Sequence, residues 1–421
     1  MYCYLDPIKP KFTAKVNILL NLFGRNFIIL LLKFHTKSLL LKRVLGLSYL
    51  LLFLACGEEK KEQLPQDGGK TSSSIGHAIG FSVEKEASGI TLINVIHPWP
   101  NSEKTFTYAL APKEKQSFLT LNKDAYDAII SVPVEKLVVT STTHIPALEA
   151  LGVLDKLVGF PDTQYISSKA ARSRIEGGFI KELGQNETLN TEAVLALQPE
   201  LVVGFSISSD NATYKTFQRS NIPVVYNGDW VEETPLGKAE WIKFFAPFFG
   251  KEREADSIFN QIEVSYLKAK ALAQKAPTSP TVLSGALYKD VWYLPGGKSW
   301  AATFLKDANA DYLWKDTEET GSLSLSWESV LNKAKHAEYW IGPGQFNSYT
   351  NMKESSAHYE QFDAFQDQNI HSYTNTLGET GGVLYYELAP QRPDLVLQDL
   401  IHIFHPNLLP DYEPYFFKPL K

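Results

Sequence analysis

Cys56 has the surroundings of a lipid attachment site. It follows Phe53-Leu54-Ala55 and precedes Gly57, at the end of an apolar run, Val44–Ala55, that starts directly after Lys42-Arg43. A basic segment, a short apolar segment and a small residue before the cut are typical of an export signal. A cysteine directly after the cut is typical of a lipobox, although Phe53 stands where an aliphatic residue is usual. We therefore expect residues 1–56 to be the export-signal region and Cys56 to be acylated. An alternative for the first part of this region is that translation starts downstream of Met1. The alternative is an uncleaved membrane anchor, for which the apolar run is short.

Hydroxyl and aromatic side chains follow four apolar segments that we predict to be buried strands. Ligands of doubly wound sheets bind beyond the carboxyl ends of the strands. Aromatic rings at such positions could stack on a planar ligand, or could fill the core instead. The candidates from this half of the chain are Ser141, Thr142, Thr143, Tyr165, Phe205, Asp229 and Trp230.

Strands and helices alternate around these candidates. Apolar runs at 136–140, 156–160, 200–205 and 222–226 predict strands, and helical spacing predicts helices at 145–151 and 188–197. Buried strands that alternate with helices indicate a parallel sheet covered on both faces, an α/β fold.

A long helical region separates two such alternating segments. Pro247 and Gly250 divide it into predicted helices Pro235–Phe249 and Lys251–Gln274, the second with an apolar stripe that includes Ile258, Ile262 and Leu272. After it, we predict strands at 280–286, 339–342 and 370–373, and helices at 299–306, 327–335 and 393–404.

The region before the first alternating segment has a different pattern. Residues 57–75 are charged and then rich in Gly and Ser, which is typical of a flexible tether. Residues 76–133 contain three apolar alternating runs, at 81–83, 90–96 and 105–110, with a turn at Ser88-Gly89. We therefore expect a β-hairpin region added to a first lobe at 134–250, a linker helix at 251–276 and a second lobe at 277–421.

Composition restricts the function. The net charge of −6 gives no basic surface for nucleic acid. The two cysteines are Cys3 and Cys56, so the mature chain would have no disulfide and no cysteine metal site.

Three segments carry a resemblance to a known family. The segments 136–142, 150–159 and 189–202, the last of which reads LNTEAVLALQPELV, resemble the first lobe of the periplasmic siderophore- and cobalamin-binding proteins of ABC importers. The most specific part of this resemblance is residues 184–201. The resemblance covers about residues 134–421. It implies two Rossmann-like lobes with parallel sheets, joined by one long rigid α-helix, with the ligand held between them.

The resemblance also implies roles for particular residues. In the family an acidic residue of each lobe docks onto the permease, and Glu192 and Glu328 occupy those places, each in a Glu-x-Val-Leu sequence at a helix start. The alternative is that each simply favours the helix dipole. For the second lobe we expect ligand contacts from the aromatic residues and from the arginine that precedes the last helix: Trp292, Tyr293, Trp300, Tyr385, Tyr386 and Arg392.

The partners implied are a permease with its ATPase, and a ferric siderophore, a corrinoid or a haem-like ligand. We expect a monomer in the periplasm, attached to a membrane through its lipid only, with exposure at the cell surface as an alternative. No resident cofactor or metal is expected.

Two other functions stay open at this point. A Rossmann-like enzyme is one, although the chain has no Gly-x-Gly-x-x-Gly fingerprint, no Walker A loop and no Gly-x-Ser-x-Gly elbow. A zinc or manganese importer component is the other, and it would need several histidine and carboxylate ligands converging between the lobes. His144 lies at a strand end, but His97, His402 and His405 show no ligand spacing.

Overall fold

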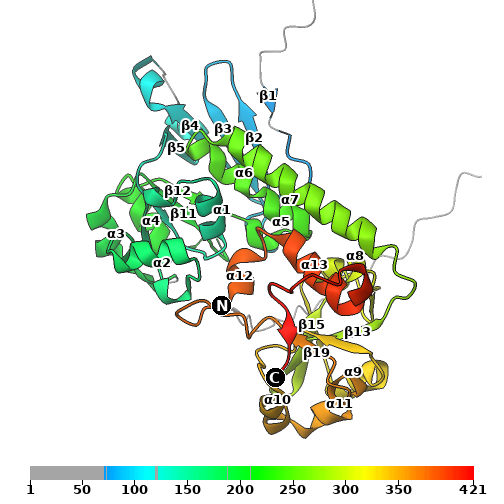
Figure 1. The fold of residues 1–421 in the computed structure, drawn as a ribbon. Helices are drawn as coiled ribbons and strands as arrows, with labels where there is room; N and C mark the ends of the chain where they lie inside the picture. Colours follow the sequence, from blue (N-terminus) through cyan, green and yellow to red (C-terminus); the bar gives the residue numbers. More distant parts are fainter. Residues whose placement is uncertain (1–70, 73, 119–121, 187, 209) are drawn as a thin grey trace, which may run out of the picture. The chain divides into compact units, whose positions relative to one another are not determined.

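The computed structural model describes residues 71–72, 74–118, 122–186, 188–208 and 210–421 (Figure 1). The predicted export signal, Cys56 and most of the predicted tether lie outside these residues. The long helix α7 (Glu252–Ala273) separates two groups of sheets. We call residues 74–250 the N-lobe and residues 277–421 the C-lobe; the domain boundaries expected from the sequence stay a prediction. None of the helices in the described ranges has the length and apolar character needed to cross a membrane.

The N-lobe is built on a parallel sheet of five strands in the order β12-β11-β6-β7-β8. The central strands β6 (Leu137–Val139) and β11 (Leu201–Gly204) are buried along their whole length, as the continuous apolar runs predict. The other strands are β7 (Leu157–Phe160), β8 (Lys181–Glu182) and β12 (Val224–Tyr226). The connecting helices are α1 (His144–Ala150), α2 (Lys169–Glu176), α3 (Thr191–Leu197) and α4 (Ala212–Arg219). A two-stranded ribbon, β9 (Gly184–Gln185) with β10 (Thr188–Leu189), precedes α3.

A second five-stranded sheet precedes the parallel one. Its strands are antiparallel except for the parallel pair β4–β5, and Tyr108 of β4 joins it to the parallel sheet, because the Tyr226 N–H donates to the Tyr108 hydroxyl at 3.0 Å. The three strands predicted before residue 113 are present as β2, β3 and β4. The five strands are β1 (Thr71–Ser72), β2 (Phe81–Lys85), β3 (Thr91–Ile96), β4 (Thr105–Pro112) and β5 (Ala128–Val132).

The helix predicted at 235–249 is shorter and broken. It forms α5 (Pro235–Glu240) and α6 (Ile242–Phe245), which meet at Trp241, and then a 3₁₀ turn at Ala246–Phe248. Pro247 explains the last break, since its nitrogen carries no N–H to continue the helical hydrogen bonds.

Helix α7 contributes to both lobes. Its 22 residues extend about 33 Å at 1.5 Å per residue. Its first turns bury Ala255, Phe259 and Ile262 in the N-lobe core, whereas its last turns bury residues in the C-lobe core. In Figure 1 it runs beside α5 and α13. The C-lobe contacts come from Tyr266, Ala269 and Ala273.

The C-lobe contains a five-stranded sheet in the order β16-β13-β18-β19-β20, parallel except for β19–β20. Its strands are β13 (Thr281–Ser284), β16 (Asp311–Tyr312), β18 (Tyr339–Ile341), β19 (Ile370–Ser372) and β20 (Lys418–Pro419). The helices are α8 (Trp300–Asp307), α9 (Trp327–Ala334), α10 (Tyr349–Ser355), α11 (Asp363–Gln366), α12 (Leu384–Leu388) and α13 (Pro393–Phe404).

The single strand predicted at 280–286 is divided between two sheets. Gly285 has a positive φ of 78°, and the chain turns there from β13 into an antiparallel sheet in the order β14-β15-β17. The sequence did not predict this sheet. Its strands are β14 (Ala286–Tyr288), β15 (Val291–Pro295) and β17 (Ser322–Leu325).

Candidate ligand-binding site

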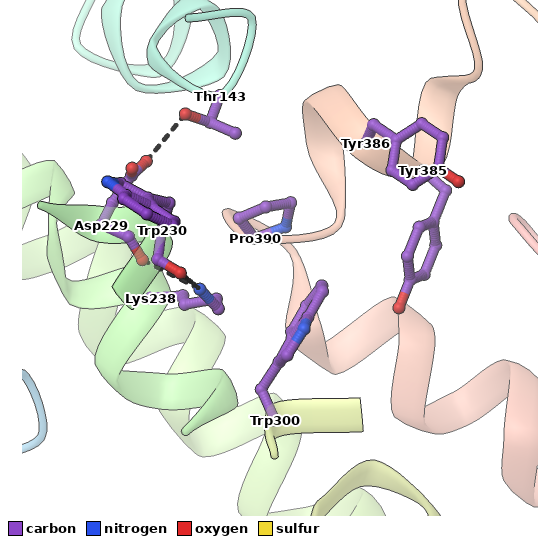
Figure 2. A pocket seen from close by; sticks show the side chains of 8 residues that line it. All are labelled: Thr143, Asp229, Trp230, Lys238, Trp300, Tyr385, Tyr386 and Pro390. Atoms are coloured by element: carbon purple, nitrogen blue, oxygen red, sulfur yellow. Dashed lines mark hydrogen bonds between the residues drawn. The ribbon is translucent and has the colours of Figure 1, made fainter. Parts of the chain in front are cut away.

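A pocket of about 210 Å³ lies between residues of the N-lobe and residues of the C-lobe (Figure 2). Half of its lining residues come from strand ends and α5 before the long helix, and half come from α8, α12 and the turn after α12. The lining residues are Thr143, Asp229, Trp230, Lys238, Trp300, Tyr385, Tyr386 and Pro390.

The end of β6 and the end of β12 supply the first polar pair. Thr143 lies at the start of α1, and its hydroxyl donates to Oδ2 of Asp229 at 2.7 Å. Asp229 lies in the 3₁₀ turn Asp229–Val231 after β12, where its backbone N–H donates to Oδ1 of Asn227 at 2.9 Å. Asp229 is buried, so the hydrogen bond from the Thr143 hydroxyl partly compensates for the lost hydration of the Asp229 carboxylate.

Lys238 of α5 supplies the cation of the pocket. Its ammonium donates to the carbonyl oxygens of Asp229 at 2.9 Å and Trp230 at 3.1 Å (Figure 2). It also lies 5.2 Å from the centre of the Trp300 ring, within cation–π range. Burial lowers the pKa of Lys238 to about 8, against the opposing charges of Asp229 and Glu232. At neutral pH the group therefore stays cationic, with a reduced cost of losing its proton.

Aromatic rings form the rest of the wall. Trp300 is the first residue of α8, which Ser299 caps by accepting the Ala302 N–H. The ring of Tyr385 lies 5.9 Å from that of Trp300 and stacks on Tyr373 at 4.2 Å and 11°. Large, oriented rings of this kind offer flat apolar faces to a ligand, beside one ammonium and one carboxylate.

The predicted ligand residues separate into two groups. Thr143, Trp230, Trp300 and Tyr385 line the pocket, as do Asp229 and Tyr386. Phe205 lies behind the wall, with its ring 5.2 Å from that of Trp230. Tyr165 is 51% exposed and does not line the pocket, and neither do Thr142 and Tyr293.

Two predicted contacts are made elsewhere. Trp292 is a core residue: it is 0% exposed, stacks on Trp340 and donates its indole N–H to the Ser284 carbonyl at 3.0 Å. It does not line the pocket. Arg392 forms a bidentate ion pair with Asp394, in which both N–O distances are 2.9 Å. This ion pair raises the pKa of the Arg392 guanidinium. This ion pair joins Arg392 to the first turn of α13, and Arg392 does not line the pocket.

Lys238 and Pro390 are the lining residues that the sequence analysis did not select. Lys238 lies in the segment PLGKAEWIKFF, which also contains Glu240 and Lys243, so no signal in the sequence distinguished Lys238 from these two residues. Pro390 carried no signal either.

His144 lies directly behind Thr143. It is completely buried, and neither ring nitrogen has a hydrogen-bond partner among the described residues. Burial lowers the pKa of His144, against the opposing charge of Asp229 and the nearby Asn227 side chain, whose contact with the ring does not reach hydrogen-bond geometry. The described ranges contain no group of three or more His, Cys, Asp or Glu side chains that could hold a metal ion.

Glu192 and Glu328 occupy equivalent positions in the two lobes. Each is exposed and is the second residue of its helix, α3 or α9. The helices are capped in the same way: Asn190 accepts the Ala193 N–H, and Ser326 accepts the Ser329 N–H. Both carboxylates therefore lie at helix N-termini on the surface.

Comparison with known proteins identifies the family. Residues 137–375 match the model of the periplasmic binding protein family. This span is more than half of the 421 residues, and the chain belongs to the periplasmic binding protein family. The resemblance to periplasmic solute-binding proteins of ABC importers, inferred from the sequence, is confirmed.

Several individual proteins are similar over most of their length. An uncharacterized lipoprotein of Methanocaldococcus jannaschii is 25% identical over 346 residues, which cover 77% of this chain and 80% of that protein. A second uncharacterized lipoprotein of the same organism is 21% identical over 396 residues, covering 88% of this chain and 96% of that protein.

Solved structures share the fold. A periplasmic heme-binding protein from Pseudomonas aeruginosa aligns with a TM-score of 0.52 at 18% identity, covering 68% of this chain and 98% of that one. A periplasmic heme-binding protein of Vibrio cholerae aligns with a TM-score of 0.50 at 17% identity, covering 62% of this chain and 99% of that one. The α/β fold with parallel sheets, predicted from the sequence, is confirmed.

Proposed function

We propose that this chain is the substrate-binding component of an ABC importer, attached to a membrane through an acylated Cys56. It captures a bulky metal chelate, either a ferric siderophore, a haem or a corrinoid, and delivers it to a permease with its ATPase. The observation that carries the proposal is the pocket between the lobes, which is lined by four aromatic side chains, one ammonium and one carboxylate.

The chemistry of the pocket suits a planar or ring-rich ligand with anionic groups. Trp230, Trp300 and the two tyrosines offer faces for stacking, and Lys238 offers a cation that already faces a ring. The volume of about 210 Å³ is smaller than the roughly 300–1,000 Å³ of typical ligand pockets. A chelate of the proposed size would therefore require the pocket to widen between the lobes.

The placement of the chain follows from the same proposal. The lipobox-like sequence before Cys56, two lipoproteins among the relatives and the family itself support a periplasmic protein held by a lipid. Glu192 and Glu328, exposed at equivalent helix starts, are the proposed contacts with the permease.

Ligand titration tests the proposal. We expect haemin, a ferric catecholate, a ferric hydroxamate or cobalamin to raise the melting temperature of the purified full chain, since a ligand that binds the folded state stabilises it by mass action. Trp300→Ala should weaken binding roughly thirtyfold, in the range of a central aromatic contact. Trp327→Ala is the matched control, because Trp327 stacks on His358 and does not line the pocket.

Two results would contradict the proposal. One is a melting temperature that responds to zinc or manganese and to none of the four chelates, which favours the metal-ion importer instead. The other is chelate binding that Trp300→Ala and Trp327→Ala weaken equally.

A further inference from the structure

Helix α12 of the C-lobe makes direct contact with the N-lobe. It packs against α1, and it carries Tyr385 and Tyr386, two of the rings that line the pocket opposite Thr143. The position of this five-residue helix therefore determines the distance between the two walls of the pocket.

The next residue of α12 is a carboxylate that reaches across to the N-lobe. Glu387 is 2% exposed, and its two oxygens accept the backbone N–H groups of Ser167 at 2.5 Å and Ser168 at 2.8 Å. These residues precede α2, and Ser168 is its N-cap. A buried carboxylate is unfavourable unless it is hydrogen-bonded, so these two bonds connect the lobes at a position where their loss is costly.

Further contacts surround this connection. The Thr380 hydroxyl donates to the Gln164 carbonyl at 2.6 Å, and the Ser167 hydroxyl donates to the Gly382 carbonyl at 3.2 Å. A Cβ atom on Gly382 would lie 2.5 Å from the Tyr165 carbonyl oxygen, so the two backbones touch. We call Glu387, Thr380 and their N-lobe partners Gln164, Ser167 and Ser168 the interlobe clamp.

One charged neighbour faces the clamp from α1. Ser168 donates its hydroxyl to Glu149 at 2.6 Å, which places a second carboxylate beside Glu387. Burial raises the pKa of Glu387 to about 7, with a smaller contribution from Glu149 and against the two backbone N–H groups.

We infer that Glu387 is a positioning residue, which holds α12 on the N-lobe in the ligand-free chain and thereby sets the width of the pocket through Tyr385 and Tyr386. The inference rests on the proposed function only in taking this pocket as the ligand site. The clamp itself exists without ligand and can be measured without it.

The test measures the separation of the lobes in the absence of ligand. In the full chain, with Cys3 and Cys56 replaced by serine, single cysteines at the exposed positions Gln218 of α4 and Glu354 of α10 carry a pair of distance labels. Amide exchange of α12 is measured in parallel. The variants are Glu387→Gln and Thr380→Val.

Asp399→Asn is the matched control. Asp399 is also a buried carboxylate that accepts backbone N–H groups, those of Tyr415, Phe416 and Phe417, but all its partners belong to the C-lobe. Its loss should lower the melting temperature without changing the distance between the labels.

We expect Glu387→Gln to add a longer distance to the single distance of the reference chain, and to make exchange at α12 roughly tenfold faster. Thr380→Val should cause a smaller change of the same sign, and it decides the test if Glu387→Gln does not fold. An unchanged distance and unchanged α12 exchange in the folded variants would overturn the inference, as would the same changes in Asp399→Asn. Neither result depends on whether a chelate binds.

Discussion

The surroundings of His371 in β19 disfavour the protonated, charged form of its side chain. Its Nδ1 atom is buried and has no hydrogen-bond partner among the described residues. Burial lowers the pKa of His371 to about 4, and the charge of His402 acts in the same direction. Between pH 6.5 and pH 4 the unfolded chain therefore binds a proton that the folded chain does not bind.

Stability should accordingly fall as the pH falls through this window. From pH 7 to pH 5 the contribution of His371 amounts to about 2 kcal/mol of unfolding free energy. We expect His371→Gln to remove this part of the acid sensitivity, measured by urea unfolding at both pH values. If His371→Gln and the reference chain lose the same stability between pH 7 and pH 5, the role of His371 is contradicted.

Glu240 of α5 connects the start of the N-lobe to the helices before α7. Its carboxylate accepts the N–H groups of Gly76, His77 and Ala78 and pairs with Lys243 at 3.0 Å, with both side chains at most 8% exposed. Removing Glu240 takes the acceptor from three backbone N–H groups and leaves the buried Lys243 ammonium only the more distant, half-exposed carboxylate of Asp256, at 3.5 Å. We expect Glu240→Ala to cost about 3–5 kcal/mol in urea unfolding.

The chain offers a control with the same spacing. Lys251 and Glu254 form an ion pair at i,i+3, but their side chains are 36% and 48% exposed. Glu254→Ala should cost far less than Glu240→Ala, because an ion pair between exposed side chains contributes little to stability. Equal losses in the two variants would contradict the importance of burial at Glu240.

At the scale of elements, Gly285 separates β13 from β14. Its φ of 78° disfavours any residue with a side chain, and a Cβ atom would lie 1.9 Å from the Tyr293 carbonyl oxygen. We expect Gly285→Ala to lower the unfolding free energy by about 3 kcal/mol or more, since strain and overlap act together.

Gly250, before α7, isolates the contribution of backbone strain. It has a similar φ of 68°, but a Cβ atom there would meet nothing within 4 Å. Gly250→Ala should cost about 1–2 kcal/mol. If thermal or urea unfolding gives the same loss for both glycines, the close approach of Tyr293 has no energetic importance.

The sequence analysis did not predict helix α12, and of the elements it missed this one has the largest effect on the pocket. Its sequence, LYYEL, is five residues long, too short for a helical period to be recognised. The prediction of Tyr385 as a ligand contact rested on its residue type, whereas the helix that aims Tyr385 is held by Glu387 and by packing on α1.

At the scale of the whole molecule, the two lobes present Glu192 and Glu328 at equivalent places. We expect the double variant Glu192→Lys and Glu328→Lys to keep chelate affinity, because neither residue lines the pocket. Uptake by cells that contain the matching importer should fall, and more in the double variant than in either single one, since surface charges orient the encounter. The melting temperature should fall only slightly, since a helix-dipole interaction contributes about 0.3–1 kcal/mol of unfolding free energy for each residue.

Normal uptake in the double variant would exclude the docking role. A loss of uptake that parallels a large loss of melting temperature would instead favour a structural role for the two carboxylates. Lys181→Glu and Lys353→Glu, which reverse charge elsewhere on each lobe, control for a nonspecific effect of charge.

The sequence by itself determined the family, the α/β class, the long helix between the lobes and the strands of both parallel sheets except the two-residue strands β8, β16 and β20. It could do so because buried parallel strands read as short apolar runs, and because the segment 189–202 combines a capped helix with such a strand. These signals are local, and each depends on residues that are close together along the chain.

Only the tertiary structure decided which candidates share a pocket. Trp292 and Trp300 are eight positions apart and of the same type, yet one lies in the C-lobe core and the other faces Lys238 across the pocket. Lys238 is identified as a pocket residue only by the structure, in which α5 places its ammonium beside the Trp230 carbonyl. Burial and cross-lobe contacts such as Glu387 with Ser167, 220 positions apart, arise from packing between distant segments, and no local pattern encodes them.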